Sequence, residues 1–129
     1  PADVYNLIVG TDSFLNSETL FVSAVIIHRV GHGGRYFYRK NPRRKMDSLR
    51  QRIFFEATMS IELASLLKDR LDSSSLRKLA VEIHLDVGDK GETREIIREI
   101  VGMVTGSGYA ARTKPGSFGA SKVADRHSK

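Results

Sequence analysis

The segment from Met46 to Leu71 contains no glycine or proline and is rich in strong helix formers, which predicts one long helix. The sequence on either side of it contains short apolar runs that end at glycine, which is typical of buried strands. A helix between strands needs a sheet on which to pack its apolar face. We therefore predict an α/β fold, and 129 residues with 40% hydrophobic content suffice for a single domain over residues 1–129.

Five segments have the composition of strands. The glycine-rich turn from Gly31 to Gly34 predicts that the second and third are joined as an antiparallel hairpin, and Asn41-Pro42 is expected to end the sheet pattern. The fourth alternates apolar and polar residues, and the fifth is short. The predicted strands are residues 5–9, 19–30, 35–39, 79–87 and 109–113.

Two further helices complete the predicted order of elements. Residues 93–104 carry Ile96, Ile100 and Val104 at helical spacing, and residues 117–126 follow Pro115-Gly116 with modest helical propensity. The order is three strands, helix, strand, helix, strand, helix. This order predicts a mixed five-stranded sheet with helices on its faces, in which the first and fourth strands are parallel neighbours.

The composition excludes several kinds of site and location. No cysteine is present, so there is no disulfide, no thiolate metal site and no cysteine nucleophile. No apolar run is long enough to span a membrane, and the first residues do not resemble a signal peptide, so we expect a cytoplasmic protein. The chain does not begin with Met, and we expect an N-terminal segment to be missing from it. The oligomeric state is left open.

Basic residues favour a polyanionic partner. The formal net charge is +6, and Lys and Arg gather in residues 39–52 and again toward the C-terminal end. The partner expected from this charge is nucleic acid, as RNA, an RNA/DNA hybrid or DNA; the alternative is a solvated loop and tail. The expected phosphate-binding residues are Arg39, Arg43, Arg44 and Lys114.

Acidic residues fall where parallel strands end. Asp12 follows the apolar part of the first strand, and Asp86 has the same place on the fourth. In parallel neighbours these two carboxylates would lie at one edge of the sheet, where open α/β folds place their sites. A strand-end Asp can instead cap a turn, but two carboxylates buried side by side are costly without a cation.

The long helix offers two glutamates. Helical phase places Glu56 among apolar residues, whereas Glu62 shares a polar face. A carboxylate on an apolar face needs a partner, so we favour Glu56 as the site residue, while the spacing along the chain leaves Glu62 open. Asp125 is available as a fourth acid or is a surface charge. His84 shares a strand face with Asp86, because residues two apart on a strand point the same way. His84 is either a ligand in the site or a structural residue.

Three or four carboxylates without cysteine suit one or two hard cations, Mg²⁺ or Mn²⁺. Two such ions can activate water and stabilise the leaving oxygen in phosphodiester cleavage, so no protein nucleophile is required. The predicted catalytic and metal-binding residues are Asp12, Glu56, Asp86 and Asp125.

Three segments resemble the YkuK-like, ribonuclease H-like family of bacteria, whose order of elements is the one predicted above. They are residues 7–13 (LIVGTDS), 82–88 (EIHLDVG) and 114–121 (KPGSFGAS). The resemblance implies a nuclease-type fold, and the ribonuclease H acidic pattern carried over to this chain falls on the same four acids. Bacterial ribonucleases H often have a His before the last helix, and the segment KPGSFGAS has none.

The sequence thus predicts a metal-dependent nuclease acting on RNA, an RNA/DNA hybrid or structured DNA. The alternative is a catalytically idle ribonuclease H-like module that binds nucleic acid or protein through its basic surface. A third reading is a structural or regulatory protein in which the carboxylates hold one metal for stability.

Overall fold

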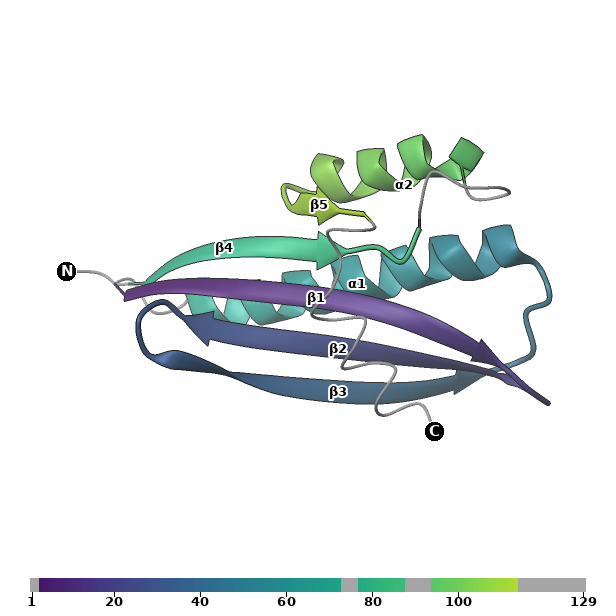
Figure 1. Cartoon of the computed structure of the whole chain (residues 1–129), viewed down its shortest axis with the longest axis horizontal. Helices are drawn as coiled ribbons and strands as arrows, with labels where there is room; N and C mark the ends of the chain where they lie inside the picture. The colour runs from purple at the N-terminus through teal and green to yellow at the C-terminus, as the bar shows by residue number, and fades with distance from the viewer. Residues whose placement is uncertain (1–2, 73–76, 88–93, 114–129) are drawn as a thin grey trace.

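The computed structural model describes residues 3–72, 77–87 and 94–113, and in these ranges the chain forms one sheet with two helices (Figure 1). The elements are β1 (Asp3–Leu15), β2 (Thr19–Arg29), β3 (Gly33–Arg43), α1 (Leu49–Asp72), β4 (Arg77–His84), α2 (Arg94–Gly106) and β5 (Ala110–Arg112). The strand order is β3-β2-β1-β4-β5. β1 pairs antiparallel with β2 and parallel with β4, so the predicted mixed sheet is confirmed. The predicted closing helix, residues 117–126, lies outside the described ranges.

The main core lies between the sheet and both helices. Alternate residues of the strands, such as Leu7, Val9 and Ile83, point toward the helices and pack on Ile53 and Ile100. The intervening residues point to the opposite face, where Ile8, Phe14, Leu20, Val22 and Ala24 form a second, smaller cluster. The helical phase predicted from the sequence is confirmed, because Ile96, Ile100 and Val104 are all buried. No described helix is long and apolar enough to cross a membrane.

β3 continues further than the sequence predicts. Asn41 and Pro42 were expected to end the sheet, yet they pair with Phe21 and Leu20 of β2, so that expectation is wrong. The physical reason is the position of β3 at the sheet edge, where a proline costs no ladder hydrogen bond if its nitrogen faces outward. At the other end of the strand, Gly31 and Gly33 have φ angles of 84° and 86°, which permit the tight hairpin turn.

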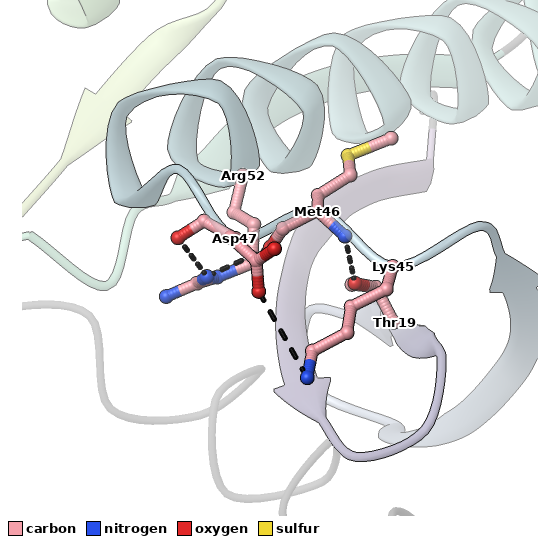
Figure 2. A network of polar contacts seen from close by, with 5 residues as sticks. All are labelled: Thr19, Lys45, Met46, Asp47 and Arg52. Carbon is pink, nitrogen blue, oxygen red and sulfur yellow. Dashed lines mark hydrogen bonds and ion pairs between the residues drawn. The ribbon is translucent and has the colours of Figure 1, made fainter.

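A polar network fixes the start of α1 (Figure 2). The backbone N–H of Met46 donates to the buried Thr19 hydroxyl over 2.7 Å, and Arg52 donates to the carbonyls of Met46 and Asp47 over 2.9 and 3.1 Å. The Ser48 side chain accepts from the Gln51 N–H over 3.2 Å, which is an N-cap. The helix therefore begins at Leu49 and not at Met46, because Ser48 caps its N-terminus and the Met46 N–H is bound by Thr19 of β2.

Candidate active site

β4 is shorter than β1, and the two strands part where the acidic residues begin (Figure 1). Their last paired residues are Gly10 and His84, while β1 continues along β2 as far as Leu15. Asp12 and Asp86 each come two residues after that last pair. Asp12 therefore lies inside β1, and Asp86 lies in the segment after β4. The parallel neighbours are as predicted, and the two acids are at equivalent positions along them. The prediction that the first strand ends before Asp12 is wrong, because pairing with β2 carries β1 on to Leu15.

Glu56 reaches the same region from α1. The Ser13 hydroxyl donates a hydrogen bond to the Glu56 carboxylate, and the negative charge of Asp86 acts on the same group. Glu56 is partly buried, whereas Glu62 is exposed beside β3. Of the two helix glutamates that the sequence left open, Glu56 is the one placed beside β1 and Asp86. The helical phase that favoured Glu56 predicted this difference.

The environment of Glu56 opposes its negative charge. Burial raises the pKa, Asp86 raises it further, and the Ser13 hydroxyl and backbone together with Arg52 lower it; the result is a pKa of about 7. The carboxyl is therefore close to half protonated at neutral pH. A divalent cation beside Glu56 and Asp86 would favour the ionised carboxylates and so offset the cost of burial and the repulsion from Asp86, and oxygen donors of this kind fit a hard metal ion.

Asp12 is buried, and it projects from the other face of β1. Thr11 donates to or accepts from Ser60 of α1, and Ser13 contacts Glu56, so the odd-numbered residues face the helix. Asp12 is opposite Val22, which belongs to the cluster on the far face. Within the described ranges, no three Asp, Glu or His side chains are close enough together to hold one metal ion. The metal-binding role of the predicted acids stays a prediction, and Asp125 lies outside these ranges.

His84 belongs to a polar cluster with Glu82 and Arg112 on the same far face. Its Nε2 is 3.3 Å from Glu82, and Arg112 of β5 donates to the other oxygen of Glu82 over 3.2 Å. Burial alone would raise the pKa of Glu82, but the contacts with His84 and Arg112 outweigh it and lower the pKa. The contact with Glu82 accounts for Nε2 of His84, and whether His84 is a ligand or a structural residue stays open.

Three features of the site were not found from the sequence. These are the Ser13 contact to Glu56, the Arg112 contact to Glu82, and a buried set of hydroxyls in which Thr11 lies 2.8 Å from both Ser23 and Ser60. The position of Ser60 on the apolar face of α1 was the one sign of that set. The predicted phosphate-binding residues Arg39, Arg43 and Arg44 are exposed on or just after β3, and Lys114 lies outside the described ranges.

Glu56 makes stability depend on pH in metal-free buffer. In the unfolded chain its carboxyl loses its proton near the ordinary value of 4.5, whereas the folded protein keeps that proton until about pH 7. Below about pH 4.5 the carboxyl is protonated in both states, so its burial does not lower the free energy of unfolding. That free energy decreases as the pH rises from 4.5 to 7, and the decrease is complete above about pH 7. The size of this decrease is up to about 3 kcal/mol.

Urea unfolding in the presence of a chelator, at several values between pH 4.5 and 8, measures this effect. The Glu56→Gln variant has no ionising group, so it is expected to gain stability relative to the original protein as the pH rises. Parallel pH profiles for the two proteins would contradict the assigned pKa.

Comparisons with known proteins identify the family. The sequence model of the family described as Ribonuclease H-like matches residues 1–129. The Bacillus subtilis (strain 168) protein named "Uncharacterized protein YkuK" is 35% identical over 142 residues, which cover 100% of this chain and 82% of that protein. The solved structure of prototype foamy virus protease-reverse transcriptase (native) is similar with a TM-score of 0.48 and 7% identity, over 98% of this chain. This chain spans 21% of the length of that viral chain.

The match to the family extends over the whole chain, and the described elements follow one another in the order that the resemblance implied. The chain belongs to the ribonuclease H-like family.

Proposed function

We propose that this protein is a metal-dependent nuclease that hydrolyses phosphodiester bonds in RNA, an RNA/DNA hybrid or structured DNA. The observation that carries the proposal is the position of Glu56 where β1 and β4 part, because burial there, together with the negative charge of Asp86, raises the pKa of its carboxyl to about 7. Perturbed carboxyls at a strand-end edge of an α/β sheet are typical of catalytic sites. Membership of the ribonuclease H-like family supports this reading.

One or two Mg²⁺ or Mn²⁺ ions would be held first by Glu56 and Asp86, with Asp12, on the opposite face of β1, and Asp125 as the further proposed acids. Magnesium is often bound through one or two carboxylates together with substrate phosphates, so a complete protein cage is not needed. When bound, the metal supplies activation of water and stabilisation of the charge that develops on the phosphate. Ser13 orients the Glu56 carboxyl, and Arg52 contributes positive charge beside it.

The basic residues of β3 and of the segment after it would supply affinity for the phosphate backbone without reading base sequence. We place the protein in the cytoplasm as part of the same proposal. The second candidate function is an idle module that binds nucleic acid without cutting it. It is favoured by the position of Asp12, which projects from the face of β1 opposite to Ser13 and Glu56.

Incubation of the intact protein with labelled RNA/DNA hybrid, duplex DNA and single-stranded RNA tests the proposal. We expect cleavage of at least one substrate in Mg²⁺ or Mn²⁺ and none in a chelator. Salt-sensitive binding to these substrates without any cleavage would overturn the nuclease proposal and favour the idle module.

A further inference from the structure

A row of basic and aromatic side chains follows β3 on the side that faces α1. The pairing of β3 with β2 places Arg35, Phe37 and Arg39 opposite Ile27, Val25 and Ser23. Val25 belongs to the core beneath α1, so alternation along the strand directs this row toward the helix side. Phe37 is 52% exposed although it is a large apolar side chain at the sheet edge.

Three adjoining hollows run beside this row, and we call them together the β3 groove. The first, of about 360 Å³, shares Phe37 with the second, of about 320 Å³, and the second shares Arg39 with the third, of about 560 Å³. The middle hollow is lined by apolar side chains from the sheet and from α1: Val25, Ile27, Leu63 and Leu67. An exposed aromatic ring therefore stands at the margin of an apolar hollow.

The charge along the groove is predominantly positive. Arg35 lines the first hollow, Arg39 the second and third, and Arg43 the third, where Glu62 is the acid present. Among the residues that the structure describes, none of these three arginines forms an ion pair with a carboxylate. Arg43 instead lies 5.8 Å from the centre of the Phe55 ring. The arginines are thus available to an anion that enters the groove.

We propose that the β3 groove binds single-stranded nucleic acid, with a base stacked on Phe37 and the backbone phosphates held by Arg35, Arg39 and Arg43. Surfaces that combine a basic track with exposed aromatic rings bind unpaired strands, because every base offers a flat face for stacking. A paired base cannot offer that face, so the ring and its apolar hollow select a single strand. Residues four apart on a strand are about 13 Å apart, so the arginines span several nucleotides.

A second copy of this chain is a poorer occupant. An edge strand can pair with the same strand of another molecule, but β3 carries Arg35, Arg39, Lys40 and Arg43 and no acid. Two such strands would bring like charges together, which opposes pairing. The same charges attract a phosphate backbone.

The groove is separate from the candidate active site. β3 is the outer strand of the sheet and β2 lies between it and β1, so the groove would hold a part of the substrate away from the bond that is cut. The binding does not depend on metal or on cleavage. Binding is therefore measured in the presence of a chelator, which prevents metal-dependent cleavage. A failure to bind single strands can then be distinguished from a failure of the proposed nuclease activity.

Fluorescence anisotropy with labelled 12-nucleotide single-stranded RNA and DNA, and with an abasic DNA strand of equal charge, tests the proposal. We expect the strands with bases to bind about 10-fold more tightly than the abasic strand, as stacking of one or two bases implies. Phe37→Leu should remove this difference, while Phe37→Tyr, which keeps the ring, should retain it.

The arginines are tested through salt dependence. Arg39→Gln is expected to weaken binding of both strands and to reduce the slope of log affinity against log salt by about 1. Arg50→Gln is the matched control, since Arg50 is on α1 and pairs with Glu99 over 3.1 Å. Equal affinity for abasic and base-containing strands, or an unchanged preference in Phe37→Leu, would overturn the proposal, as would a stable dimer in light scattering that Phe37→Leu dissociates.

Discussion

Glu56→Gln is expected to lower the rate of Mg²⁺-dependent cleavage by about 10²-fold or more, which is the scale of loss when one preorganised electrostatic group is removed from an active site. The substitution keeps the shape and the hydrogen-bonding capacity of the side chain, so the contact with Ser13 can persist while the negative charge is lost. The pH dependence described above predicts that the variant is folded and, in metal-free buffer at pH 8, more stable than the original protein. Lost activity would then not reflect unfolding.

Glu62→Gln is the matched control on the same helix. Glu62 is exposed and lines the third hollow of the β3 groove. A residue that acts on substrate binding alone does not change the rate at saturating substrate, so its loss is expected to change that rate by less than about twofold. Initial rates at saturating substrate across a Mg²⁺ titration compare the two variants. If Glu62→Gln were inactive and Glu56→Gln active, the site would lie on the other side of α1.

The remaining acids separate the two candidate functions. Asp86→Asn should match Glu56→Gln, because Asp86 acts on the Glu56 carboxyl across the region where β4 ends. Asp12→Asn should lose a similar fraction of the rate if the two faces of β1 contribute to one metal site. Full activity in Asp12→Asn would exclude Asp12 from the site and leave the pair Glu56 and Asp86.

Phe21→Ala is expected to lower the free energy of unfolding by about 3–5 kcal/mol. Phe21 is 0% exposed, and its ring centre is 4.8 Å from that of Phe55 on α1, so truncation leaves a cavity between the sheet and the helix. Phe55 precedes Glu56 along the helix, so the same contact joins this part of α1 to β2.

Phe37→Ala provides the control for this change. The same truncation at Phe37 removes a ring that is 52% exposed, so we expect a loss of no more than about 1 kcal/mol. Urea unfolding followed by circular dichroism measures both variants. A loss below about 1 kcal/mol for Phe21→Ala would contradict the packing of α1 on the sheet through this residue.

Local patterns were sufficient for most of the secondary structure. The absence of glycine and proline predicted α1, and the spacing of Ile96, Ile100 and Val104 predicted α2, because both depend on neighbours within one or two turns. The errors came where contacts from other elements decide. Pro42 was expected to end β3, and only the place of β3 at the sheet edge makes that proline tolerable.

The sequence by itself determined the type and order of the elements, the parallel relation of β1 and β4, and the different faces of α1 on which Glu56 and Glu62 lie, since alternation and helical phase are properties of the local chain. Only the tertiary structure decided which groups meet. The Ser13 contact, the charge of Asp86 and the burial that together set the pKa of Glu56 come from three elements distant in sequence. The exposure of Phe37 beside an apolar hollow likewise depends on how far α1 covers the sheet, which no local pattern encodes.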